Sequence, residues 1–120
     1  MEPFQPRPVK PVVPFSLFEQ LDIRLGTIRS VEEVAGSRKL MKLHVSFGDH
    51  NRDILAGIKQ ERADPTVLIG QQALFVVNLE PRKMAGQLSE GMLFDIGSAD
   101  GLLPALAVPE RPLPDGAGAA

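Results

Sequence analysis

Hydrophobic and polar residues alternate strictly between residues 41 and 47. The apolar positions of this segment are Met41, Leu43, Val45 and Phe47. A period of two predicts a β-strand with one face in the core, because successive side chains point to opposite sides of a sheet. The other face then carries Lys42 and His44. Residues 48–51 have the composition of a turn, so we expect residues 53–58 to return as the second strand of a hairpin.

Three further segments predict strands. Residues 73–77 and 92–96 are short apolar runs bounded by turn residues, which is typical of buried strands. Residues 22–34 predict a long first strand whose alternation changes phase at Gly26 and Thr27, where a glycine permits a bulge or a sharp bend. Five strands with a long, bent first strand predict an all-β fold, a five-stranded OB-fold barrel with short helices and terminal extensions.

Two short helices are expected around this barrel. Ser16 and Glu19 have the spacing of a capping box, which predicts a helix from Ser16 through about residue 21. The apolar residues of this first helix share one face and are expected to close one end of the barrel; they are Phe15, Phe18 and Leu21. Asp64 and the following proline predict the start of a second helix over residues 65–69, between the third and fourth strands.

The two ends of the chain differ in composition from its middle. Residues 1–14 contain five prolines, which predict an extended tail because proline fixes φ and has no N–H donor. Residues 15–113 are expected to form the barrel domain, and residues 114–120 a flexible tail. The apolar segment 102–108 is interrupted by proline, so we expect it at a sheet edge or in an arm, where the second subunit of a homodimer would cover it.

Composition narrows the class of protein. A chain of 120 residues with 43% hydrophobic content suits one domain with a modest core. It has no cysteine and no apolar stretch of about 20 residues, which argues against disulfides, thiolate metal sites and a membrane span. Prolines interrupt the N-terminal segment throughout, which argues against a signal peptide and favours a cytoplasmic location.

Charge is distributed unevenly along the chain. The formal net charge of −2 argues against indiscriminate coating of nucleic acid. Residues 37–83 nevertheless contain eight Lys/Arg and five Asp/Glu, whereas the rest of the chain contains five and ten. The middle of the chain is therefore basic, and both flanks are acidic.

Residues suited to catalysis are sparse. His44 and His50 have no carboxylate or hydroxyl at a spacing typical of a catalytic triad or a metal site. Ser89 has no base beside it that would activate the hydroxyl, and the chain has neither a phosphate-binding loop nor a dinucleotide fingerprint. We therefore predict a binding module with no enzymatic activity, no metal and no cofactor.

Residues 78–92 join two predicted core strands and are expected to form a loop held at both ends. The loop contains Arg82, Lys83, two glycines and the hydroxyl of Ser89. Loops on a rigid scaffold often carry binding residues, although a loop that is merely solvated has a similar composition. Arg24 presents the same choice, because it is placed either to pair with Asp22 or to join a binding face.

Five segments, in order along the chain, resemble the tRNA-binding domain family. They are residues 22–28 (DIRLGTI), 38–43 (RKLMKL), 56–58 (AGI), 78–86 (NLEPRKMAG) and 89–92 (SEGM). The similarity runs from about residue 18 to residue 115, with departures at residues 34–38 and 61–65. Members of the family include free-standing dimeric tRNA-binding proteins, the C-terminal extension of some methionyl-tRNA synthetases, and the secretion chaperone CsaA.

The resemblance implies an OB barrel whose terminal segments form a dimer interface, and a site for tRNA. It implies RNA contacts from the basic loop and from the Ser-x-Gly-Met motif, at Arg82, Lys83, Ser89, Gly91 and Met92. We extend the predicted site to further polar and cationic residues: Lys42, Asn78, Arg38, Lys39 and Arg24.

Aromatic composition indicates how such a site would recognise RNA. The chain has no Trp and no Tyr, which disfavours base stacking along a single strand and favours recognition of folded tRNA through phosphates and 2′-hydroxyls. The alternatives are a CsaA-type chaperone for unfolded preproteins and a tRNA-binding accessory subunit of an aminoacyl-tRNA synthetase.

Overall fold

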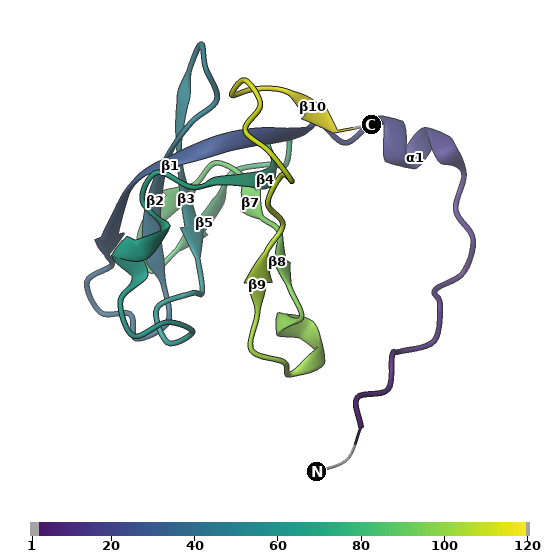
Figure 1. Ribbon diagram of the computed structural model, residues 1–120, viewed down its shortest axis with the longest axis horizontal. Helices are drawn as coiled ribbons and strands as arrows, with labels where there is room; N and C mark the ends of the chain where they lie inside the picture. Colours follow the sequence, from purple (N-terminus) through teal and green to yellow (C-terminus); the bar gives the residue numbers. More distant parts are fainter. Residues whose placement is uncertain (1–2, 120) are drawn as a thin grey trace.

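The computed structural model describes residues 3–119. Its main sheet is antiparallel and curls into a nearly closed barrel, which confirms the predicted all-β, OB-like architecture (Figure 1). The strands of the central path, in spatial order, are β3 (Asn51–Ala56), β2 (Met41–Ser46), β1 (Ile23–Glu33), β4 (Gln72–Val76) and β7 (Met92–Leu93).

The barrel interior is filled by the residues that the alternation places there. In β2, buried and partly exposed positions alternate without exception, and its partners in β3 follow in register from Met41 with Ala56 to Ser46 with Asn51. Phe47 packs edge-on against Phe75 of β4, with ring centroids 5.6 Å apart. Each fully buried side chain of this size contributes roughly 1.5–3 kcal/mol to folding, so the core determines which face of each strand points outward.

The register shift in β1 lies at Arg29, two residues beyond the predicted pair Gly26 and Thr27. Register with β2 shifts between Ile28 and Ser30, so Arg29 is the extra residue of the bulge, and the prediction of a bulge at Gly26 and Thr27 is wrong. Gly26 is required for a different reason, because a Cβ there would lie 2.6 Å from Cγ1 of Val45. The phase change in the sequence therefore marked a close approach of two strands, which glycine permits because it has no side chain.

The two helices differ in how well they were predicted. The second is confirmed as the 3₁₀ helix η1 (Pro65–Leu68), in which the Asp64 side chain accepts a hydrogen bond from the Thr66 N–H at 3.0 Å. The first, α1 (Phe15–Glu19), begins one residue early, with Pro14 as N-cap and no side-chain cap, so the predicted capping box at Ser16 is wrong. Pro14 has φ −61° and ψ 142°, an extended conformation that ends the tail and places Ser16 inside the helix.

Helix α1 also stands away from the barrel instead of closing it (Figure 1). Phe15 is 69% exposed and Phe18 is 40% exposed, and none of the helix residues is buried. The predicted packing of Phe15, Phe18 and Leu21 into the barrel end is therefore wrong. Residues 3–14 continue as an extended, exposed arm that returns to the body through an ion pair between Arg7 and Asp100, at 2.7 Å.

The C-terminal part of the chain completes the fold. Strands β8 (Asp95–Ile96) and β9 (Ala105–Leu106) form a hairpin that contains the 3₁₀ helix η2 (Ser98–Asp100), so part of the apolar segment 102–108 lies in a short sheet. Residues 118–119, expected in a flexible tail, form β10 (Gly118–Ala119) and pair with the start of β1. Residue 120 lies outside the described residues.

Candidate nucleic-acid interface

The segment expected as a loop at residues 78–92 contains a β-hairpin. Strand β5 (Arg82–Met84) pairs with β6 (Gln87–Ser89), with Arg82 opposite Ser89 and Lys83 opposite Leu88. The turn residues Ala85 and Gly86 both have positive φ, 48° and 79°, as a two-residue hairpin turn requires. Sequence reasoning missed the hairpin because strands of three residues show no periodicity and Ala-Gly is not a typical signal for such a turn.

The hairpin carries two exposed cations. Arg82 and Lys83 point to opposite faces because they are consecutive in a strand, and neither forms an ion pair with any residue in the range 3–119. Strand β6 lies beside β3, where the Leu55 N–H donates to Oγ of Ser89 and the Glu90 N–H donates to the carbonyl of Asp53. This antiparallel course carries the turn of the hairpin beyond the Ala56 end of β3.

The loop between β1 and β2 projects from the same end of the barrel, because Met41 at the start of β2 pairs with Ala56. Arg38 and Lys39 are exposed in this loop and form no ion pair within the described part of the chain. The Ser37 hydroxyl accepts from the Leu40 N–H at 3.0 Å, and the Lys39 carbonyl accepts from the Lys59 N–H at 3.0 Å. The backbone that presents these cations is therefore held by hydrogen bonds.

The Ser-x-Gly-Met motif lies in the closure of the barrel. Ser89 is 3% exposed, and its hydroxyl accepts from the Leu55 N–H at 3.0 Å and donates to the Gly91 carbonyl at 3.1 Å. A Cβ at Gly91 would lie 2.9 Å from the Val76 carbonyl oxygen, so this position tolerates only glycine. Met92 is 46% exposed on β7. Of these three residues, only Met92 presents its side chain to solvent.

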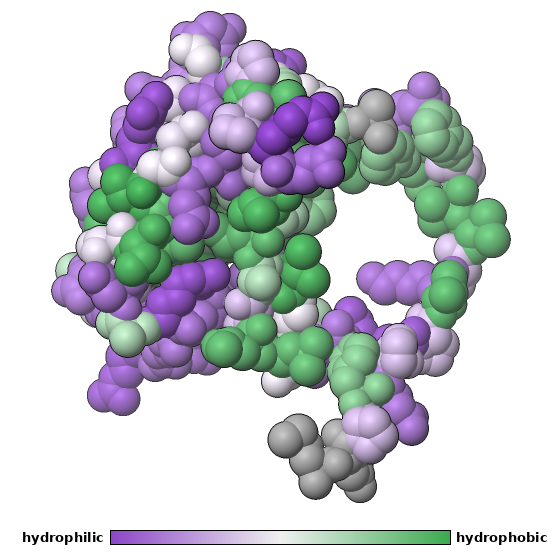
Figure 2. Space-filling model, viewed as in Figure 1, coloured by the Kyte–Doolittle hydropathy of each residue, from purple (hydrophilic) through white to green (hydrophobic). Residues whose placement is uncertain are grey.

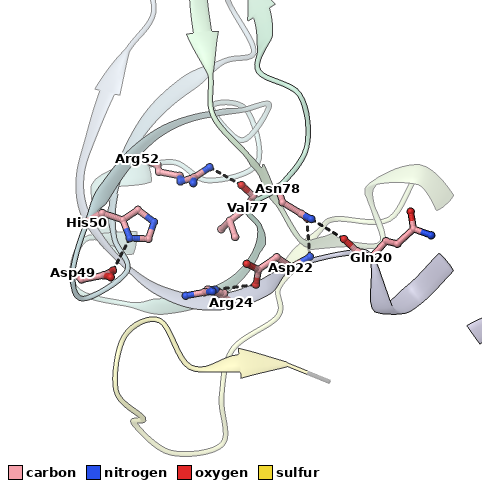
Figure 3. A network of polar contacts seen from close by, with 8 residues as sticks. All are labelled: Gln20, Asp22, Arg24, Asp49, His50, Arg52, Val77 and Asn78. Atoms are coloured by element: carbon pink, nitrogen blue, oxygen red, sulfur yellow. Dashed lines mark hydrogen bonds and ion pairs between the residues drawn. The ribbon is translucent and has the colours of Figure 1, made fainter. Parts of the chain in front are cut away.

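Asn78 and Arg24 are engaged in the network at the other end of the hairpin segment (Figure 3). The Asn78 side chain accepts from the Asp22 N–H and donates to the Gln20 carbonyl, both at 2.7 Å. Arg24 donates from Nε to the Asp22 carboxylate at 2.8 Å, and this hydrogen bond holds the pKa of Asp22 below its ordinary value. Arg24 thus takes the first of its two predicted roles, as a partner of Asp22.

We call the β1–β2 loop with Arg38 and Lys39, and the hairpin β5–β6 with Arg82 and Lys83, the two basic loops. Strands β2 and β3 lie between them, and the positive charges on the outer face of these two strands are balanced by a carboxylate. Lys42 Nζ is 3.6 Å from one oxygen of Asp53, and Nδ1 of His44 is 2.7 Å from the other. Lys42 is therefore a paired cation. The predicted cations divide into two groups, with Lys42 and Arg24 bound to carboxylates and the remaining four free of ion pairs within residues 3–119. The free ones are Arg38, Lys39, Arg82 and Lys83.

Arg52 is the residue of this region that sequence reasoning missed. Its guanidinium Nη1 donates to the Val77 carbonyl at 2.5 Å (Figure 3) and to the Glu90 carbonyl at 3.2 Å, near the two ends of the hairpin segment. Arg52 is partly buried near the start of β3, opposite the buried Val45 of β2, and its hydrogen-bond partners are two carbonyls that are distant in the sequence. No sequence pattern signals such a contact.

Two further observations bear on the class of site. Across residues 3–119, His, Asp and Glu side chains do not gather in groups of three or more that would suit a metal ion. In the same range no helix is long and apolar enough to cross a membrane.

Comparison with known sequences identifies the family. Residues 23–117 match the family model described as "Putative tRNA binding domain". The chain is 43% identical over 101 residues to a methionine–tRNA ligase from Phocaeicola vulgatus, and 38% identical over 104 residues to the one from Enterococcus faecalis. These alignments cover 83% and 86% of this chain but 15% of each ligase, so the chain spans about a seventh of the length of these relatives.

Solved structures extend the comparison to whole chains. A MetRS-related protein from Pyrococcus horikoshii has a TM-score of 0.84 at 32% identity, with 92% of this chain and 100% of that chain covered. The chaperone CsaA from Bacillus anthracis has a TM-score of 0.75 at 31% identity, with the same coverage. The barrel, its hairpin and these matches show that the chain belongs to the putative tRNA binding domain family.

Proposed function

We propose that this protein binds folded tRNA through the two basic loops at one end of the barrel. The observation that carries the proposal is the position of Arg38, Lys39, Arg82 and Lys83, which project from that end and have no carboxylate partner among residues 3–119. A cation already paired with a carboxylate gains little by approaching a phosphate, whereas a free one releases counterions from the RNA when it binds. The free cations, and not the paired Lys42 and Arg24, therefore supply most of the affinity.

The distribution of aromatic residues favours folded RNA over an extended single strand. Phe47 and Phe75 are buried in the core, and the exposed phenylalanines are in the arm and α1. The outer face of β2 and β3 thus carries no Phe, Tyr or Trp on which successive bases would stack, and the ring of His44 on this face is bound to Asp53. Contacts to phosphates and 2′-hydroxyls on a defined RNA shape require only cations and small donors. Ser89, Gly91 and Asn78 support this surface by fixing the backbone that carries it.

The test compares two variants that lose the same charge. Arg82→Ala plus Lys83→Ala should weaken binding of total tRNA by about tenfold or more, because each lost phosphate contact removes a favourable electrostatic term. The control is Arg29→Ala plus Arg111→Ala, since these arginines line a cleft that neither basic loop reaches. Filter binding should show little change for the control. Equal losses in the two variants would mean that only net charge matters.

Two observations favour second candidates. The exposed apolar side chains of the arm and α1, together with the match to CsaA, favour a chaperone that holds unfolded preproteins. The matches to methionine–tRNA ligases favour an accessory role beside an aminoacyl-tRNA synthetase. Suppression of preprotein aggregation without tRNA binding would select the first, and co-purification with a synthetase would select the second. In each case we propose a binding module in the cytoplasm, without catalysis of its own.

The same apolar surface supports a homodimer. Residues of the arm are almost fully exposed, with Val12 at 99%, and they face the barrel across an open space (Figure 2). A groove beside β10 is lined largely by apolar residues, including Leu25, Leu74 and Ala107. An extended arm with this much exposed apolar area is stabilised when a second copy covers it.

A further inference from the structure

The hairpin β5–β6 is a weakly held element that must nevertheless present its cations in a fixed position. Each of its strands has three residues, and a two-stranded hairpin of this size is marginally stable alone. Strand β6 and the residue that follows it are hydrogen-bonded to β3 through the Ser89 hydroxyl and the Glu90 N–H. The chain leaves β4 at Val77, where the Val77 N–H and the Asn78 side chain bind Asp22 and Gln20, and the Val77 carbonyl requires a further partner.

The side chain of Arg52 binds both the segment that enters the hairpin β5–β6 and the segment that leaves it. Its Nη1 donates to the Val77 carbonyl, where the excursion begins, and to the Glu90 carbonyl, where it ends. Val77 is buried, so its carbonyl requires a partner. Both hydrogen bonds come from one guanidinium nitrogen, whose N–H groups are fixed in the plane of the group, whereas the ammonium of lysine rotates about its last bond.

Neighbouring hydrogen bonds hold the N–H groups of the same two residues, Val77 and Glu90. The Val77 N–H donates to the Asp22 carbonyl and the Glu90 N–H donates to the Asp53 carbonyl, both at 2.9 Å. Both ends of the excursion are thus anchored on their N–H sides by backbone or neighbouring groups. The carbonyl groups of Val77 and Glu90 both accept hydrogen bonds from the Arg52 guanidinium.

We propose that Arg52 is a positioning residue, a clasp that fixes the base of hairpin β5–β6 on the barrel and thereby sets where Arg82 and Lys83 stand. Its consequence for RNA binding rests on the proposed function, but the clasp itself does not. Loss of Arg52 should let the hairpin open locally while the rest of the barrel stays folded, because the core contacts of β1 to β4 do not include it.

Trypsin provides a readout that is independent of RNA, because it cleaves after lysine and arginine. Arg52→Met should speed native-state cleavage after Arg82 and Lys83 by about tenfold, since cleavage follows the population of the open hairpin. Cleavage after Arg38 and Lys39, in the other basic loop, should not change. Arg52→Lys, which keeps the charge and carries three N–H donors on one freely rotating nitrogen, should be intermediate, and Arg111→Met is the matched control for loss of an exposed arginine.

The outcomes separate the clasp from the proposed function. Faster cleavage at the hairpin alone supports the clasp, whether or not tRNA affinity changes. Unchanged cleavage at the hairpin overturns it, even if the Arg82 and Lys83 double variant still weakens tRNA binding. Equal acceleration at both loops also overturns it, because Arg52 would then stabilise the whole fold. If Arg52→Met does not fold, the same comparison is made with Arg52→Lys.

Discussion

Glu61 lies with its carboxyl against that of Asp95 in β8, and its side chain is 13% exposed. Burial, followed by the contact with Asp95, raises the pKa of Glu61 to about 7, whereas Arg62, whose Nη1 is 3.2 Å away, acts in the opposite direction. Oδ1 of Asp95 is buried and has no hydrogen-bond partner within the described residues. A proton on Glu61 would give this oxygen a hydrogen-bond donor, so the stability of the fold depends on pH near neutrality through the Glu61–Asp95 pair.

This pair predicts a loss of stability as pH rises. The pKa of Glu61 is higher in the folded state than its ordinary value of 4.5, so its contribution is full below pH 4.5 and is lost as pH rises through about 7. Glu61→Gln should remove that dependence and raise the free energy of unfolding at pH 8 by about 1–3 kcal/mol. Urea unfolding between pH 5 and 8 measures it, with the exposed Glu33→Gln as control. Parallel pH profiles for wild type and Glu61→Gln would contradict the account.

At the scale of elements, the sequence predicts those parts whose signal lies within one strand. The alternation in residues 41–47 places β2 correctly, because burial of one face is decided residue by residue. The bulge at Arg29 was misplaced, because a bulge is defined by register with β2 and not by β1 alone. The contact of Arg52 with Val77 joins residues that are 25 positions apart, and the contact of Ser89 with Leu55 joins residues that are 34 positions apart. No local sequence pattern contains such contacts.

The turn of the hairpin gives a prediction at this scale. Ala85 is the only non-glycine residue with positive φ in the range 3–119, and alanine is unfavourable in that conformation. Ala85→Asn creates Asn-Gly, the preferred pair for a turn in which both residues have positive φ. We expect stabilisation of the hairpin by about 0.5–1 kcal/mol. Hydrogen exchange of the β5 and β6 amides should slow, while that of β2 stays constant; unchanged exchange in the hairpin would contradict the turn assignment.

The whole molecule is a barrel with an arm that contacts it sparsely. Among the described polar contacts, the Arg7–Asp100 ion pair and the Asn78–Gln20 hydrogen bond connect residues 3–21 to the body, while the apolar side chains of α1 remain exposed. The arm and α1 are therefore better suited to a second copy than to their own barrel. The sequence predicts the exposed arm only in part. Its prolines predict that the arm is extended, but they do not indicate which surface the arm covers.

A single substitution on α1 tests the dimer. Phe18→Asp should shift the protein from dimer to monomer at micromolar concentration, because a buried, unpaired carboxylate opposes association. Val67→Asp is the control, since Val67 is an exposed apolar residue of η1 on the barrel. Sedimentation equilibrium gives the mass of each variant. A wild-type protein that is monomeric at every concentration tested would contradict the proposal.

The proposed function requires that Arg38, Lys39, Arg82 and Lys83, which form no ion pair within residues 3–119, bind the phosphates of folded tRNA. The most direct test is the slope of log affinity against log salt for wild type, for the Arg82→Ala plus Lys83→Ala variant, and for the Arg38→Ala plus Lys39→Ala variant. Each lost phosphate contact should flatten the slope by about 0.7–0.9, so each double variant should lose roughly one to two. Slopes equal to wild type, with tRNA bound as tightly across the salt series, would show that these loops are not the site.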